Sequence, residues 1–294
     1  MPRPDQATVL RGLMERRHAV TESAPAVRAR TLAVTSGKGG VGKSNIALNL
    51  GVALGGLGAK VCLVDANLGL GNLDLLCGLN GYWNLSHVVS GARRIEEILL
   101  TGPNDVRLVP GASGLVDSAD CPLSAQRDLV EQLESLELSH DFLIIDTGAG
   151  IHRSIREFLA AAETVLVVTT PEPTALADAY ATIKSLSSLP GTELEILVNQ
   201  AETAEQAAAI LEGVQKTART FLHRTVTAAG SIPRDAAVPQ AVRARVPFVV
   251  HSPASPAATA VQRLARRLRH HASPSPACES FFPRVWSRLS GKAA

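Results

Sequence analysis

The stretch "TSGKGGVGKSN", residues 35–45, decides the fold. From Gly37 to Ser44 it matches G-x-x-x-x-G-K-[S/T], a loop that wraps phosphate groups with backbone N–H groups. In such a loop Lys43 reaches the β- and γ-phosphate oxygens, and the Ser44 hydroxyl binds Mg²⁺. Seven residues are therefore expected to hold the nucleotide: Gly39, Gly40, Val41, Gly42, Lys43, Ser44 and Asn45.

The sequence on either side favours this phosphate loop over the alternative, a glycine-rich turn. Residues 31–35, "TLAVT", predict a buried strand, and residues 45–58, "NIALNLGVALGGLG", predict a helix that stops at Gly58. Similar apolar runs recur along the chain, with amphipathic stretches between many of them. The runs cover residues 31–35, 60–65, 106–110, 141–146, 164–170, 194–199, 225–230 and 247–250. This alternation predicts a doubly wound α/β fold: a mainly parallel sheet with helices on both faces.

Composition limits the class of protein. The 294 residues carry a net charge of only +2, so overall charge does not favour a nucleic-acid partner. The four cysteines are far apart and form no C-x-x-C pair, so the sequence indicates neither a disulfide framework nor a zinc site and favours a reduced cytosol. We expect no signal peptide and no spanning helix, so any membrane contact is peripheral.

Two strand ends carry carboxylates suited to the same site. Asp146 ends the apolar run "FLIID", which resembles a Walker B strand, and would hold a water on Mg²⁺. The alternative is an aspartate that caps the next helix. Asp65 ends "VCLVD" and precedes a glycine-rich segment that can respond to a γ-phosphate.

The phosphate loop has a second lysine, Lys38, which the phosphate cradle does not require. "KGGVGKS", residues 38–44, resembles the deviant Walker A motif of the MinD/ParA family of dimeric ATPases. That resemblance implies an ATP-dependent homodimer in which Lys38 reaches the partner's phosphates, as an arginine finger does. A solvated surface lysine is the alternative. The family also has a D-x-D pair that handles the attacking water; Asp65 matches its first position, but the second is Asn67.

The base pocket is also indicated by resemblance. Asn199 in "LVNQ", with Pro233 and Asp235 in "GSIPRDAAV", resembles the family's adenine pocket, and an asparagine amide both donates to and accepts from adenine. The [NT]-K-x-D signature of guanine-specific NTPases does not occur in the sequence. Asn199 as a simple turn residue remains the alternative. The expected cofactors are ATP and Mg²⁺.

Within the family, the chain resembles the FlhG (FleN) flagellar-number ATPases over roughly residues 30–270. Phrases such as "NLGLGNLDLLCGL" and "TTPEPTALADAYATIK" carry this resemblance. The N-terminal "DQATVLR" resembles the subfamily's activator helix, which engages the flagellar GTPase FlhF, and implies partner contacts at Asp5, Gln6, Leu10 and Arg11. A frayed helix that packs on its own domain is the alternative. Flagellar switch components or a flagellar transcription regulator are further partners left open.

The C-terminal "FFPRVWSRLSGK", residues 281–292, predicts an amphipathic membrane-targeting helix. Five apolar side chains fall within an arc of about 140° on a helical wheel: Phe281, Phe282, Val285, Trp286 and Leu289. Docking onto the body of the protein is the alternative, and can be the resting state. We therefore divide the chain into an activator helix with linker (1–30), an ATPase domain (31–270), and a linker with a membrane-targeting helix (271–294). The protein is expected in the cytoplasm, and on the inner face of the membrane when ATP is bound.

A ParA-type or MinD-type positioning ATPase, which binds DNA or a division inhibitor, is the competing interpretation. The arginine-rich "VQRLARRLRHH", residues 261–271, supports it, because Arg263, Arg266, Arg267 and Arg269 can meet DNA phosphates. A solvated final helix is the commoner reason for such a run. We do not expect nucleic acid to be a partner.

Overall fold

A computed structural model describes residues 28–67, 71–111, 123–189, 191–270 and 280–289. In these residues eight strands form one sheet in the order β3-β4-β2-β5-β1-β6-β7-β8. Of the strand pairs in this described sheet, only β3–β4 is antiparallel. The strands are β1 Arg30–Ser36, β2 Val61–Ala66, β3 Leu100–Thr101, β4 Arg107–Val109, β5 Phe142–Ala149, β6 Thr164–Thr169, β7 Glu193–Ala201 and β8 Thr227–Pro233. The doubly wound, mainly parallel α/β fold is thus confirmed.

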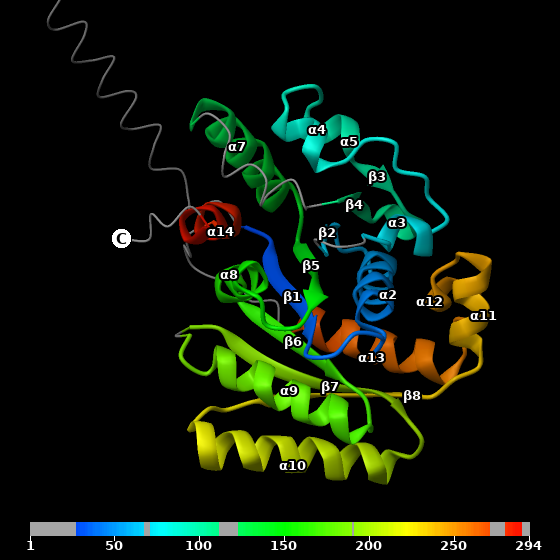
Figure 1. Cartoon of the computed structure of the whole chain (residues 1–294). Helices are drawn as coiled ribbons and strands as arrows, with labels where there is room; N and C mark the ends of the chain where they lie inside the picture. The colour runs from blue at the N-terminus through cyan, green and yellow to red at the C-terminus, as the bar shows by residue number, and fades with distance from the viewer. Residues whose placement is uncertain (1–27, 68–70, 112–122, 190, 271–279, 290–294) are drawn as a thin grey trace, which may run out of the picture.

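Helices cover both faces of the sheet, as Figure 1 shows for α2 and α13 on one side and α7, α8 and α9 on the other. The alternation of side chains along β1 explains the two cores. Ala33 packs into the core under α8 and α9, whereas Leu32 and Val34 pack into the core under α2 and α13. The helices are α2 Lys43–Gly56, α3 Leu73–Leu76, α4 Leu85–Val89, α5 Ile95–Ile98, η1 (3-10) Pro103–Asp105, α7 Leu123–Ser139, α8 Arg153–Ala161, α9 Pro173–Leu186, α10 Ala204–Leu222, α11 Ala237–Ala244, α12 Phe248–His251, α13 Pro256–His270 and α14 Phe281–Leu289.

The phosphate loop lies between β1 and α2, at the carboxyl edge of the sheet. Asp65 on β2 and Asp146 on β5 are register partners in neighbouring strands, so both carboxylates reach the same edge. Helix α2 ends at Gly56, just before Gly58 at φ 81°, close to the predicted stop. Ligands of open α/β sheets bind at this edge.

One predicted strand is wrong. Residues 248–250 of "PFVV" belong to a short helix, α12, in which Phe248 and Val249 are buried beside α2. Four apolar residues do not distinguish a buried strand from a buried helical turn. Pro247 precedes this helix, and the Val249 N–H donates to the Asn49 side-chain oxygen of α2 at 3.0 Å instead of to a neighbouring strand. The two-residue strand β3 was not predicted.

The ends of the chain are described only in part. Residues 1–27, with the activator motif, lie outside the described residues. The predicted C-terminal helix is present as α14, which packs against α7 and α8. None of the described helices combines the length and apolar character needed to cross a bilayer.

Candidate functional site

The glycines of the phosphate loop allow it to pass close to other parts of the chain. A Cβ on Gly37 would lie 2.2 Å from the Asp178 carbonyl oxygen of α9, and one on Gly42 would lie 2.5 Å from Asn199 Nδ2. Gly40 and Gly42 also have φ of 81° and 89°, in the left-handed region that favours glycine. No side chain caps the N-terminus of α2, so its N–H groups suit an anionic phosphate.

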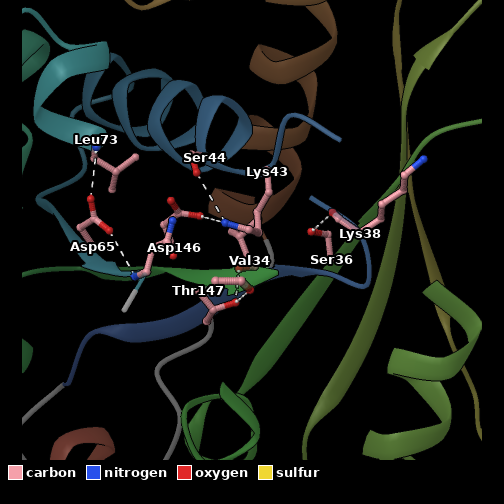
Figure 2. A network of polar contacts seen from close by, with 11 residues as sticks. Val34, Ser36, Lys38, Lys43, Ser44, Asp65, Leu73, Asp146 and Thr147 are labelled. Atoms are coloured by element: carbon pink, nitrogen blue, oxygen red, sulfur yellow. Dashed lines mark hydrogen bonds and ion pairs between the residues drawn. The ribbon is translucent and has the colours of Figure 1, made fainter. Parts of the chain in front are cut away.

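Behind the loop, Lys43 forms a buried ion pair with Asp146. The Lys43 Nζ lies 2.8 Å from Asp146 Oδ1 and 3.5 Å from Ser44 Oγ (Figure 2). Burial raises the pKa of Asp146, and the Lys43 charge and hydrogen bonds from Lys43 and Ser44 oppose that rise. Ser44 and Asp146 thus bring a hydroxyl and a carboxylate oxygen together, which are ligands that Mg²⁺ prefers. The residues present fit a magnesium ion.

Asp65 holds the segment that follows β2. Its Oδ1 accepts the N–H of Asn67 and its Oδ2 accepts the N–H of Leu73, both at 3.2 Å (Figure 2). Burial, and then the charge of Asp146, raise the pKa of Asp65 to about 6. Asn67, by contrast, lines the cavity beside the phosphate loop. Asp65 therefore holds the backbone of Asn67, and Asn67 in turn lines the cavity.

Two cavities meet at the phosphate loop. One of about 580 Å³ is lined by Lys43, Ser44 and Asn67, and the other, of about 730 Å³, by Asn199, Pro233 and Asp235 among others. Both are lined by the same three loop residues: Gly40, Gly42 and Asn45. The predicted phosphate and base residues therefore belong to one continuous site. A cavity of about 770 Å³ at the amino-terminal ends of β6 and β7 is lined by none of the predicted nucleotide-site residues.

Residues that line the cavity of about 730 Å³, here called the base-side cavity, also form hydrogen bonds that join the elements around it. Asn199 Nδ2 donates to the Val41 carbonyl oxygen at 2.8 Å, which ties β7 to the phosphate loop. A bulge follows Asn199, with Gln200 at φ 58°. Asp235 accepts the N–H groups of Ala237 at 2.9 Å and Ala257 at 3.0 Å, which joins α11 to α13. Gln200 lines the same cavity and had no signal in the sequence.

Lys38 points away from its own chain's phosphate cavity (Figure 2). Its Nζ lies 2.7 Å from Glu172 Oε2 and 3.1 Å from Thr174 Oγ1, at the start of α9. Both charged side chains are exposed, Lys38 by 40% and Glu172 by 64%. Another molecule can therefore reach Lys38, although it would compete with Glu172 for the ammonium group. Glu172 and Thr174 were not predicted, because nothing in the sequence links them to residue 38.

The apolar face of α14 is buried, as in the docked alternative. Phe281, Phe282 and Val285 are 1–2% exposed and belong to the core under α7 and α8. The Glu137 carboxylate of α7 accepts the N–H groups of Phe281 and Phe282, each at 2.9 Å. Trp286 is half-buried. The Leu289 side chain, like Asp5, Gln6, Leu10 and Arg11, lies outside the described part of the chain.

Comparisons with known proteins agree with this geometry. A model of the AAA domain family AAA_31 matches residues 29–196. The antiactivator FleN of Pseudomonas aeruginosa is 37% identical over 240 residues, which cover 81% of this chain and 86% of FleN. The chain belongs to the FlhG (FleN) family of MinD-type ATPases. The flagellum site-determining protein YlxH of Helicobacter pylori is 38% identical over 188 residues, 64% of each protein.

The fold is also similar to that of solved MinD structures. The septum site-determining protein MinD of Pyrococcus horikoshii, in complex with Mg-ADP, is 27% identical, with a TM-score of 0.64 over 82% of this chain and 96% of that one. As a member of the FlhG (FleN) family, the chain is an ATPase of the flagellar-number or site-determining kind.

Proposed function

We propose that the chain is an ATP- and Mg²⁺-dependent ATPase that dimerises, associates with the cytoplasmic membrane, and sets the number or placement of flagella. One observation carries the dimer: Lys38 belongs to the phosphate loop, yet its ammonium group lies against Glu172 outside the cavity that Lys43 and Ser44 line. A lysine in that position suits a phosphate held by a second copy of the chain.

Within one chain, the site binds and orients the nucleotide. The N–H groups of the phosphate loop and Lys43 hold the phosphates, while Asn199, Pro233 and Asp235 line the cavity for adenine. Ser44 and Asp146 would hold Mg²⁺, which supplies positive charge against the phosphate oxygens. Lys43 must then exchange its Asp146 contact at 2.8 Å for the phosphates.

The attacking water would meet an amide in place of the family's second carboxylate. Asn67 lines the phosphate-side cavity, so it can accept a hydrogen bond from that water but cannot take its proton at neutral pH. Asp65 positions Asn67 through the backbone. We infer that hydrolysis is slow and that the ATP-bound dimer is long-lived.

Membrane association requires α14 to leave its docked position. The side chains that would enter a bilayer are Phe281, Phe282 and Val285, which are buried under α7 and α8. Arg284 and Arg288 on the same helix suit lipid phosphates. The docked helix would be the resting state, and two released copies on a dimer would bind the membrane through avidity.

The DNA-binding alternative loses one of its four candidate arginines. Of the arginines on α13, Arg267 forms a two-pronged ion pair with Glu195 at 2.6 and 2.8 Å, so it is not available to a DNA backbone. Arg263, Arg266 and Arg269 are exposed.

Cosedimentation of the ATP-loaded protein with anionic liposomes or with nonspecific duplex DNA distinguishes membrane association from DNA binding. We expect ATP-dependent sedimentation with liposomes, lost on deletion of residues 279–294. Unchanged sedimentation of the deletion variant would rule out the α14 anchor. Sedimentation with DNA alone would favour the ParA-type function.

The N-terminal "DQATVLR" motif supports an FlhF-type GTPase as the flagellar partner. A peptide of residues 1–17 should stimulate an FlhF-type GTPase, and Gln6→Ala or Arg11→Ala should remove the stimulation without changing ATP hydrolysis by the full chain. A peptide without effect at saturating concentration would contradict this partner. Flagellar switch components and a flagellar transcription regulator are further candidates for the same assay.

A further inference from the structure

Arg245 adopts a backbone conformation that arginine rarely takes. It follows the last turn of α11 with φ 55° and ψ 40°, in the left-handed region. The N–H groups of Arg245 and Val246 bond to the Val242 and Ala241 carbonyls, which closes the end of the helix. Glycine is the usual residue at such a helix end, because a side chain there is strained. Strained backbone conformations of this kind cluster at ligand-binding sites.

Arg245 lines the phosphate-side cavity. Val242 and the α3 residues Leu75 and Leu76 line the same cavity. The backbone of Arg245 also packs on the end of α3, since a Cβ on Gly78 would lie 3.0 Å from the Arg245 carbonyl oxygen. The position of Arg245 at this rim is therefore fixed by two elements.

The charged residues that line this cavity indicate what Arg245 can bind. Among the described residues that line this cavity, Lys43 and Arg245 are the charged ones, and none is a carboxylate. Lys43 is already paired with Asp146. Arg245 is exposed, and within the described part of the chain no hydrogen bond or ion pair holds its guanidinium group. The cavity thus has one cation that no described carboxylate compensates.

We propose that Arg245 binds the polyphosphate of the nucleotide held by its own chain, and so favours ATP over nucleotides with fewer phosphates. Guanidinium groups bind phosphate oxygens through charge-assisted, often paired, hydrogen bonds. This contact would offset the strain of the left-handed conformation. The inference rests on the proposed nucleotide site and adds to it a residue outside the phosphate loop.

The test compares ATP, ADP and AMP binding to the full chain with Mg²⁺, by competition against a fluorescent nucleotide. Protein is kept at a concentration where sedimentation shows a monomer. Arg245→Gln should weaken ATP binding by about tenfold or more, and AMP binding much less. Arg245→Lys should recover part of the loss, because it keeps the charge. Arg266→Gln, an exposed arginine on α13, is the control and should change nothing.

Thermal unfolding of the nucleotide-free protein separates binding from a structural role. Arg245→Gly should weaken ATP binding as Arg245→Gln does, while its melting temperature stays equal to or above that of the wild type. The proposal would be overturned if Arg245→Gln bound ATP as tightly as the wild type does. It would also be overturned if ATP and AMP binding fell equally, or if the loss of binding were confined to the dimer. Failure of the wild type to bind ATP would instead contradict the proposed function.

Discussion

At the scale of single residues, the two lysines of the phosphate loop have separate environments. Lys43 is buried against Asp146, and Lys38 is exposed against Glu172. The spacing of glycines and Lys43 predicted the cradle from sequence, because that motif is local. The position of Lys38 relative to Glu172 was not predictable, since the two residues are 134 positions apart and meet only through the fold.

Substitution of each lysine should therefore give a different defect. Lys43→Ala is expected to abolish ATP binding, because it removes the cation inside the cavity. Lys38→Ala should keep nucleotide affinity within about twofold of the wild type, because Lys38 lies outside the cavity, but lose ATP-driven dimers and turnover. Equilibrium binding and sedimentation measure the two effects. Equal loss of affinity in both variants would refute the separate roles.

Asn67 is predicted to limit hydrolysis. Asn67→Asp restores a carboxylate in the phosphate-side cavity, and a positioned general base contributes typically about 10²–10⁴-fold. We expect single-turnover hydrolysis at saturating ATP and protein to rise at least about tenfold. A variant no faster than the wild type would show that Asn67 is not limiting, and would contradict the long-lived ATP dimer.

Asp65 gives the nucleotide-free protein a pH dependence of stability. Its folded-state pKa is raised to about 6 from an ordinary 3.8, so its contribution to the free energy of unfolding is complete below about pH 4 and is lost as pH rises through about 6. Asp65→Asn keeps the side chain neutral throughout. Relative to this variant, the wild type should lose on the order of 2 kcal/mol between pH 4 and pH 7. Parallel melting profiles for the two proteins would exclude this ionisation.

At the scale of elements, long periodic segments were predictable and short ones were not. Helix α2 and most of the buried strands followed from their apolar patterns. Residues 248–250 instead belong to α12, where the Val249 N–H donates to Asn49, 200 positions away in the sequence. The amphipathic pattern predicted α14 as a helix. It could not tell a bilayer from a protein core, because both accept the same apolar face.

Glu137 is predicted to hold α14 in its docked position. Glu137→Gln leaves one of the N–H groups of Phe281 and Phe282 without a carboxylate oxygen, at a cost of about 1–3 kcal/mol. We expect faster hydrogen exchange in α14 and greater liposome binding without ATP. The control is Glu157→Gln, which removes only a partly exposed contact with Arg288 at 3.8 Å and should have little effect. If both variants behave as the wild type does, the Glu137 carboxylate does not control docking.

At the scale of the whole molecule, one chain contains the parts of the proposed nucleotide site except for the cation that Lys38 would bring from a second chain. The phosphate cavity, the base cavity and the Ser44–Asp146 pair all lie at one edge of the sheet. If Lys38 acts on the partner's nucleotide as proposed, hydrolysis would be a property of the dimer, and turnover would be linked to the proposed membrane association.

Mixing two inactive chains tests this central claim most directly. Lys38→Ala keeps its own cavity intact, and Asp146→Asn keeps its Lys38 but lacks the carboxylate for Mg²⁺. If Lys38 acts on the partner, a mixed dimer has one complete site, so an equal mixture should recover up to about a quarter of wild-type hydrolysis while each variant alone stays inactive. If Lys38 acts in its own chain, every site in the mixture lacks one component. No recovery of hydrolysis in a mixture where pull-down of one tagged variant shows mixed dimers would contradict the account.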